Sequence, residues 1–393
     1  MEFNELIQKH NIWRKNCINL VASENRMSPL SILALNSDMV GRYYFKKIFE
    51  TETGLKYDYR GTKYIAEMYE TTENLAKELF GASYVNLEML SGHLANINIL
   101  FSYCRPGDTI ICSDTRYGGY PGLDADKLPK YLGLNVEFLP QSEIGGGIDI
   151  ERLESLISET SPRLVMLSSS ITITPFPVKE VSDLCHRYDI PFCYDASHPL
   201  GLIAGKQFQD PFSEGADIII GSTHKSFPGP QGGIILGSEE LFKVEEATDF
   251  VSVDNIHVNR VAALGVTLLE MKSFGESYAI QIIANAKALA KALETKGFTV
   301  EFKSIGYTQS HQFILRKDFG CYSKFTSDME NNGLILDNSG RVGVSEITRM
   351  GMKENDMTTV ACFFEQVANN KFISTDVFDF MSSFQKVLYC FDD

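Results

Sequence analysis

One lysine stands in a sequence setting that could turn its amine into a nucleophile. Lys225 follows the apolar run of residues 217–220 and precedes a glycine- and proline-broken loop at residues 228–233. An apolar run of this length predicts a short buried strand of a parallel sheet. At the mouth of such a strand a lysine is partly desolvated, and desolvation lowers the pKa of its ammonium group. The neutral amine can form a Schiff base with an aldehyde such as pyridoxal 5'-phosphate, whereas a lysine in an ordinary surface turn does no chemistry.

A second polar group that suits this chemistry follows another predicted strand. Asp195 and His198 come after the apolar residues 190–194. A carboxylate in this place would keep the pyridine nitrogen of the cofactor protonated, so that the ring acts as an electron sink. Each residue also has a purely structural interpretation, because Asp195 could cap a helix and His198 could be a packed core histidine.

A third polar segment has the pattern of a phosphate site. Ser91, Gly92 and His93 stand between a predicted strand at 83–90 and a predicted helix at 92–103. A helix start with small residues presents free backbone N–H groups, and the positive end of the helix dipole, to an anion. In an open α/β sheet, ligands bind outside the carboxyl ends of the strands, so the three segments should converge on one crevice.

The elements that must position these residues alternate along the chain. Further strands are predicted near residues 109–112, 134–139, 163–168 and 234–236, and further helices near 150–159 and 178–188. This order is typical of an α/β fold with a mostly parallel sheet. Later elements are a helical stretch at 259–296 interrupted near 273–275, strands near 298–302 and 312–315, and helices at 354–369 and 374–387.

Three parts of the chain follow from this pattern. We expect an N-terminal arm at residues 1–40 and a large cofactor-binding α/β domain at residues 41–255. Residues 256–393 should form an interdomain helix and a smaller C-terminal α+β domain. A chain of 393 residues is long enough for such a division.

Composition and charge argue against several classes of partner and site. The chain has 36 basic and 51 acidic residues, a net charge of −15, which disfavours nucleic acid and anionic membranes as partners. It contains no run of 18 apolar residues and no apolar signal core at its charged N-terminus. The eight cysteines are scattered and form no CxxC pair. We therefore expect a cytoplasmic protein with free thiols, no metal and no membrane partner.

Six segments carry a resemblance to a known family. They are INLVASEN, LAKELFGASYVNLEMLSGHLAN, PGDTI, YDASHPLGLIAG, GSTHKSFPGPQGG and SGRVGVSEITRMGM, and they span the chain from about residue 18 to 355. In these segments the chain resembles the serine hydroxymethyltransferases, pyridoxal-phosphate enzymes of the aspartate-aminotransferase fold. The resemblance implies a large domain with a mostly parallel, seven-stranded type of sheet and a smaller C-terminal domain. It also implies an amino-acid substrate and a homodimer with shared active sites.

The resemblance implies roles for residues around the cofactor. Those near its reacting groups are Lys225 as the Schiff-base lysine, Asp195 as the partner of the pyridine nitrogen, and His198 and Ser170 beside the phenolic oxygen. Those around the phosphate are Ser91, Gly92, His224 and His93, the last standing where the family has a serine.

On the substrate side, the resemblance assigns one arginine and three hydroxyl residues. Arg341 would clamp the α-carboxylate of an amino acid, a role that suits a bidentate guanidinium. Tyr59, Tyr43 and Ser23 would lie near the same substrate. The resemblance further implies that the tyrosines of the 43–59 region serve the site of the neighbouring subunit.

Two departures from the family pattern affect residues expected to do acid–base work. Tyr120 replaces a histidine that stacks on the cofactor ring. An aromatic ring can still stack there as a catalytic neighbour, but it is no longer an imidazole that titrates near neutrality. Phe45 stands where the family has a glutamate used in hydroxymethyl transfer, although another gap placement brings Glu50 or Glu52 close to that position.

Two further departures concern loops near the substrate. Gln231 replaces an arginine in the loop after Lys225. Only residues 338–340 separate residues 334–337 from Arg341. The family has a longer loop here, and that loop contributes to a folate site.

Three functions stay open on the sequence. The departures favour a folate-independent enzyme that acts on a small amino acid through an external aldimine, by aldol cleavage, transaldol exchange, decarboxylation or related chemistry at Cα or Cβ. The overall match favours a folate-dependent serine/glycine hydroxymethyltransferase, with tetrahydrofolate as a second cofactor. A non-catalytic paralogue is the third, and the pairing of Lys225 with Asp195 argues against it.

Overall fold

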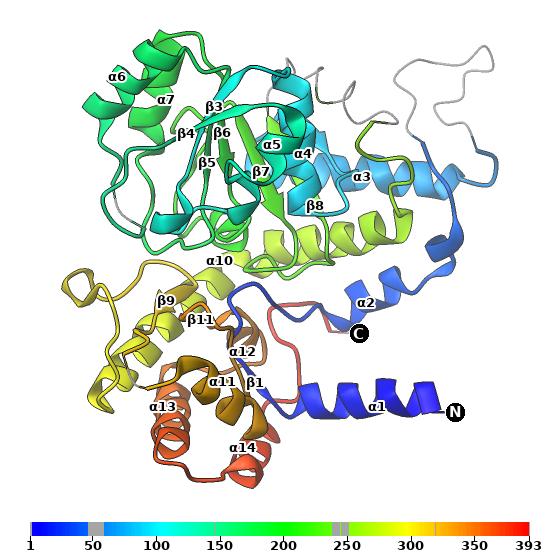
Figure 1. Ribbon diagram of the computed structural model, residues 1–393. Coiled ribbons are helices and arrows are strands. Elements are labelled where there is room, and N and C mark those ends of the chain that lie inside the picture. The colour runs from blue at the N-terminus through cyan, green and yellow to red at the C-terminus, as the bar shows by residue number, and fades with distance from the viewer. Residues whose placement is uncertain are drawn as a thin grey trace.

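A seven-stranded sheet forms the centre of the larger part of the molecule (Figure 1). The computed structural model describes residues 2–45, 59–145, 147–237, 244, 251–318 and 320–392. In spatial order the strands are β2 (Tyr84–Asn86), β8 (Gly233–Gly237), β7 (Ile218–Ser222), β6 (Phe192–Asp195), β5 (Leu164–Ser168), β3 (Thr109–Cys112) and β4 (Asn135–Phe138). All neighbours are parallel except that β8 runs antiparallel to both β2 and β7. The predicted α/β fold with a mostly parallel sheet is therefore confirmed.

The central strands are apolar because helices cover both faces of the sheet. Every residue of β5, β6 and β7 is buried, which is expected for parallel strands without a solvent-exposed face. The helices of this part of the chain are α3 (Lys63–Phe80), α4 (Gly92–Tyr103), α5 (Leu128–Leu132), α6 (Ile150–Thr160), α7 (Val178–Arg187) and α8 (Leu200–Ala204). The strands and helices predicted between residues 92 and 237 all form, with bounds that differ by at most a few residues.

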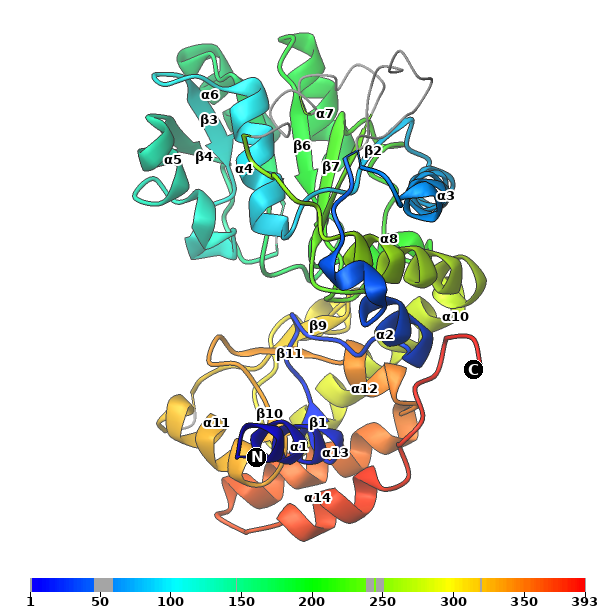
Figure 2. The same ribbon diagram turned by 90° about the vertical axis from the view of Figure 1, so that its right-hand side faces the viewer.

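One long helix joins the sheet to the C-terminal elements. Helix α10 (Val258–Thr295) has 38 residues, and Figure 2 shows it between the sheet above and the C-terminal elements below. The interruption predicted near residues 273–275 is wrong, because Gly275 lies within a continuous helix. A Cβ added to Gly205 would overlap the carbonyl oxygen of Gly275. The glycines therefore allow the end of α8 to approach the backbone of α10 closely.

The C-terminal elements form two small sheets with helices around them. The strands are β9 (Gln312–Ile314) antiparallel to β11 (Arg341–Gly343), and β1 (Ile18–Asn19) parallel to β10 (Leu334–Ile335). The helices are α11 (Tyr322–Asn331), α12 (Ser345–Arg349), α13 (Glu354–Ala368) and α14 (Ser374–Met381). The predicted strand at 298–302 is reduced to a single bridge between Val300 and Leu315. The last helix ends at Met381, earlier than predicted.

The N-terminal residues contribute to the C-terminal part of the fold. Helix α1 (Glu2–Lys15) precedes β1, which pairs with β10 from the other end of the chain. Helix α2 (Pro29–Leu35) follows, and the Ser28 hydroxyl caps it by accepting a hydrogen bond from Ser31 N. No helix among the described residues is long and apolar enough to cross a membrane.

The turn that carries Lys225 is packed against a glycine of α8, which gives a first testable prediction. A Cβ added to Gly201 would overlap the backbone carbonyl group of Ser226. Replacing Gly201 by alanine should therefore push this turn away and lower the free energy of unfolding by about 1–3 kcal/mol. Chemical denaturation of G201A measures the loss. The matched control is G41A, since a Cβ at the exposed Gly41 meets no atom within 4 Å; equal stability of the two variants would contradict the prediction.

Candidate active site

Asp195 and Lys225 lie at or just after the ends of neighbouring strands, at the carboxyl edge of the sheet. In the register of the strands, Ser168 pairs with Asp195 and Asp195 pairs with Ile220, so the ends of β5, β6 and β7 are adjacent. Lys225 follows β7 in the chain by three residues. The sequence prediction of one shared crevice depends on this adjacency.

Lys225 is a half-buried lysine with two charged neighbours, one anionic and one cationic. Desolvation lowers the pKa of its ammonium group to about 8, with Asp195 acting to raise it and Arg341 to lower it further. The backbone at this point is fixed by Asn25, whose Nδ2 donates to the carbonyl of Lys225 at 2.7 Å. Asn25 was not identified as a site residue from the sequence, although it lies in one of the six matching segments. A lysine with this pKa is partly neutral near physiological pH, as a Schiff-base nucleophile needs.

Asp195 is a buried carboxylate whose two oxygens are both engaged. Its Oδ2 accepts hydrogen bonds from the Ser168 hydroxyl at 2.6 Å and from Asn96 Nδ2 at 3.3 Å. Its Oδ1 accepts from the backbone N–H of Ser197 at 2.9 Å. Hydrogen-bond donors of this kind fix the orientation of a carboxylate. Ser168 and Asn96 were missed at the sequence level, because a serine at a strand end and an asparagine inside a helix are common.

The start of α4 forms a narrow cradle. Ser91 caps the helix, and its hydroxyl accepts from Leu94 N at 3.0 Å. A Cβ on Gly92 would overlap the hydroxyl of Ser222, so any larger residue would have to push this hydroxyl aside. The Ser222 and Ser197 hydroxyl oxygens lie 3.2 Å apart beside it. Small residues, hydroxyl groups and a helix N-terminus fit a phosphate group.

His224 has a ring nitrogen that could form a hydrogen bond with such a ligand. Its Nδ1 is buried and has no hydrogen-bond partner among the described residues. Burial, and then the charge of Lys225, lower the pKa of His224 to about 4. A neutral imidazole beside the cradle can donate one hydrogen bond to a phosphate oxygen without adding a second cation next to Lys225. On these observations the site fits pyridoxal phosphate.

A pair of buried histidines lies next to Arg341. The rings of His198 and His311 stack with centroids 5.5 Å apart, and His198 Nδ1 is 3.3 Å from His311 Nε2. Burial, followed by the charges of Lys225 and Arg341, holds the pKa of His198 well below its usual range. Burial also lowers the pKa of His311 to about 3. Both imidazoles are therefore neutral, and only His198 had been predicted as a site residue.

Arg341 lies at the start of β11 and reaches the same histidine. Its Nη1 is 3.4 Å from His198 Nε2 and donates to the backbone carbonyl of Ser170 at 2.9 Å. Its Nη2 forms an ion pair of 3.0 Å with Asp337. The structure thus brings Ser170 to the site through its carbonyl group; no hydrogen bond of its hydroxyl occurs among the described residues.

His93 and Tyr120 form a pair at the mouth of the site. The Tyr120 hydroxyl and His93 Nδ1 lie 2.8 Å apart, and the His93 side chain is exposed. Burial, and then the charge of Asp195, raise the pKa of the Tyr120 hydroxyl. The influence of Asp195 places Tyr120 close to the predicted cofactor position. His93 thus contacts Tyr120, and its role at the phosphate stays a prediction.

Among the described residues, no hydrogen bond or ring contact joins Tyr43, Tyr59 or Ser23 to Lys225. Tyr43 and Tyr59 lie beside Phe45 in an aromatic cluster, with ring centroids 5.7 Å apart between the tyrosines and 5.8 Å between Phe45 and Tyr59. Both tyrosines are exposed. Ser23 lies next to Ala22, which packs against the backbone of Gly343. Glu50 and Glu52 lie outside the described residues.

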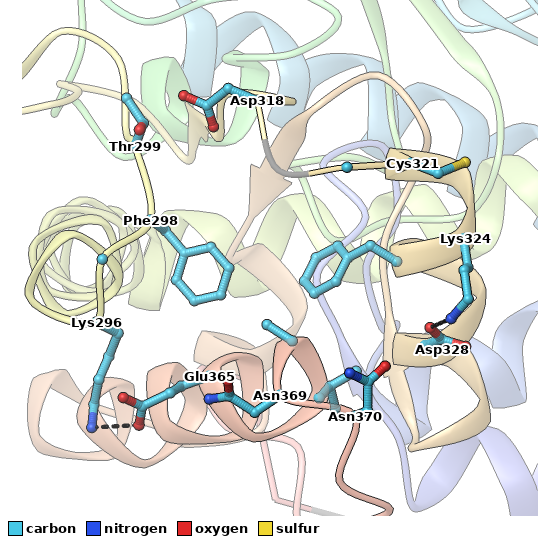
Figure 3. Close-up of a pocket in the computed structure, with 15 residues that line it drawn as sticks. Lys296, Phe298, Thr299, Asp318, Cys321, Lys324, Asp328, Glu365, Asn369 and Asn370 are labelled. Atoms are coloured by element: carbon cyan, nitrogen blue, oxygen red, sulfur yellow. Dashed lines mark hydrogen bonds and ion pairs between the residues drawn. The ribbon is translucent and has the colours of Figure 1, made fainter.

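A separate cavity in the C-terminal part has a different character. It encloses about 740 Å³ between α10, α11 and α13, as Figure 3 shows. On its rim, Lys296 pairs with Glu365 at 2.8 Å and Lys324 with Asp328 at 2.5 Å, so these charges neutralise one another. Its floor includes the buried ring of Phe325. The convergent polar groups of an active site are at Lys225 instead.

Comparison with known proteins is consistent with this geometry. The family model described as serine hydroxymethyltransferase matches residues 1–364. The serine hydroxymethyltransferase of Methanosphaera stadtmanae is 40% identical over 408 residues, covering 99% of this chain and 95% of that protein. That of Staphylothermus marinus is 38% identical over 422 residues, covering 99% and 93%.

A solved structure shows the same fold. The L-threonine transaldolase from Pseudomonas fluorescens, in its internal aldimine state, superposes with a TM-score of 0.91 and 28% identity, covering 99% of this chain and 93% of the other. The resemblance inferred from the six sequence segments is therefore confirmed. The chain belongs to the serine hydroxymethyltransferase family of pyridoxal-phosphate-dependent transferases.

Proposed function

We propose that this protein binds pyridoxal 5'-phosphate on Lys225 and acts on a small amino acid. The observation that carries the proposal is the desolvated Lys225, with a pKa lowered to about 8 between Asp195 and Arg341. When bound, the cofactor supplies an electron sink for the bond broken at Cα. The phosphate would be held by the α4 N-terminus with Ser91, Gly92 and His224.

The side chains of the site divide the work between cofactor and substrate. Asp195, fixed by Ser168 and Asn96, would hold the proton on the pyridine nitrogen. Arg341 would bind the α-carboxylate and so orient the amino acid. Tyr120 would lie against the cofactor ring, with its hydroxyl oriented by His93.

We further propose that the reaction is folate-independent and acts on the bond between Cα and Cβ, as in aldol cleavage or transaldol exchange. Phe45, with Tyr43 and Tyr59, forms an aromatic surface where folate-dependent transfer would need a carboxylic acid. The solved structure of an L-threonine transaldolase with this fold supports the same choice. Folate-dependent serine/glycine hydroxymethyl transfer is the second candidate, favoured by relatives of that name at about 40% identity.

The two candidates are separated by the effect of tetrahydrofolate. With L-threonine and a second aldehyde, we expect a new β-hydroxy amino acid to form at the same rate, within about twofold, with and without tetrahydrofolate. Chromatography of the amino acids measures both this product and glycine. Serine-to-glycine conversion that occurs only with tetrahydrofolate would instead establish the second candidate.

The pKa of Lys225 predicts how the apoprotein reacts with its cofactor. About one amine in ten is neutral at pH 7 if the pKa is about 8, against fewer than one in a thousand for an ordinary lysine. The rate of Schiff-base formation with added pyridoxal phosphate should therefore rise tenfold per pH unit below about pH 8 and level off above it. Stopped-flow absorbance measures the rate. K225A should show no such phase, and the exposed-site control K130A should match the wild type; a rate still rising above pH 9 would contradict the lowered pKa.

We also propose that the protein is a homodimer in the cytoplasm and that α1 forms part of the dimer interface. This 14-residue helix buries none of its side chains, and Figure 1 shows it projecting away from β1. Phe3, Leu6 and Trp13 are 74%, 60% and 42% exposed on it. A helix of this length is marginally stable alone, and an apolar stripe of this size needs a cover. The family resemblance names a second copy of the chain as that cover.

Removing this stripe should weaken the dimer. In the double variant F3S/L6S, less apolar surface is buried on association, so the dissociation constant should rise about 100-fold. Sedimentation velocity over a dilution series measures it. The control is E5Q on the same helix, which leaves the stripe intact. A wild-type protein of single-chain mass at all concentrations would refute the proposed dimer.

A further inference from the structure

Every edge of the Arg341 guanidinium that could take a carboxylate already has a protein acceptor. On the side edge, Nε donates to the Ser339 hydroxyl at 2.9 Å and Nη2 to Asp337 Oδ2 at 3.0 Å. On the end edge, Nη1 donates to the Ser170 carbonyl at 2.9 Å and faces His198 at 3.4 Å. A bidentate carboxylate needs two parallel N–H groups. It must therefore displace at least one of these partners.

The acceptors on the side edge belong to a turn that is built to hold them there. Asp337 Oδ1 accepts from the backbone N–H of Ser339 at 2.7 Å and also from its hydroxyl. Asn338, between Asp337 and Ser339, is held by two hydrogen bonds. Lys317 donates to the Asn338 carbonyl at 2.7 Å, and Thr326 donates to the Asn338 side-chain oxygen at 2.6 Å. The carboxylate of Asp337 is thus presented to Arg341 by an ordered turn.

The Asp337–Arg341 pair is sheltered enough for its charge to matter. The two side chains are only 20% and 15% exposed. Coulomb interactions are screened less at such sites than at the surface. In contrast, the Ser170 carbonyl is a neutral backbone acceptor, and a neutral imidazole adds no negative charge. Asp337 is the one anionic group paired with Arg341 among the described residues.

We propose that Asp337 is an internal competitor for the α-carboxylate and sets how tightly the site binds amino acids. The inference rests on the role proposed above for Arg341. An incoming carboxylate takes the place of Asp337 Oδ2 at Nη2, while Asp337 keeps the hydrogen bonds of its turn through Oδ1. The competition lowers affinity for every ligand that carries an α-carboxylate. It leaves ligands without that group unaffected.

Asparagine at position 337 tests this, since it keeps the shape and the Oδ1 acceptor but removes the charge. For the D337N holoenzyme we expect glycine to bind about tenfold more tightly than to the wild type, with methylamine binding unchanged. Titration of the cofactor absorbance measures both dissociation constants without turnover. The S339A variant removes the neutral Nε partner, together with the hydroxyl that donates to Asp337, but keeps the charge of Asp337, so it should tighten glycine binding by a smaller factor. The control for charge removal is D328N, whose partner is Lys324 on α11.

The outcomes separate this inference from the proposed function. Weaker glycine binding by D337N would mean that Asp337 positions Arg341 rather than competing with its ligand, and would overturn the inference. Equal changes for glycine and methylamine would also overturn it, because the effect would not involve the carboxylate. If neither amine changes the absorbance of the wild type, the proposed function fails. If R341Q binds glycine as the wild type does, the role of Arg341 fails, and with it the competition.

Discussion

The desolvation of the Lys225 amine is the constraint on which the arrangement of the site depends. A half-buried ammonium is costly, and the lysine responds with a pKa lowered to about 8. Each neighbouring group has a charge that suits this state. Asp195 supplies the anion that limits the shift, while His198 and His224 are kept neutral by burial and by the lysine itself. The two imidazoles therefore add no positive charge to that of Lys225 and Arg341.

The parallel sheet makes this concentration possible. Because β5, β6 and β7 run side by side in the same direction, their ends deliver Ser168, Asp195 and the Lys225 turn to one edge. The close approach of glycines beneath them, at Gly201 and Gly92, leaves no room for other side chains. Packing therefore fixes where the reacting groups lie, and electrostatics fixes their protonation.

The cofactor side and the substrate side of the site differ in how they are built. The cofactor side rests on buried hydrogen bonds within the large sheet. The proposed substrate side includes Arg341 of β11, the Asp337 turn and the aromatic cluster of Tyr43, Phe45 and Tyr59, whose two tyrosines are exposed. Exposed residues such as Tyr43 and Tyr59 can change with little effect on the fold, so one fold can serve more than one reaction.

The fold class could be read from the sequence, and so could the positions of Asp195 and Lys225 at or after strand ends, because short apolar runs ending in polar residues are local patterns. The sequence also placed α4 and its N-terminal glycine correctly. It misjudged the continuity of α10, since the reason for Gly275 is a contact with Gly205. The tertiary structure alone shows that His311 stacks on His198, 113 residues away, and that Asp337 forms an ion pair with Arg341. Such pairings depend on how the C-terminal part packs against the sheet, and no local periodicity encodes that packing.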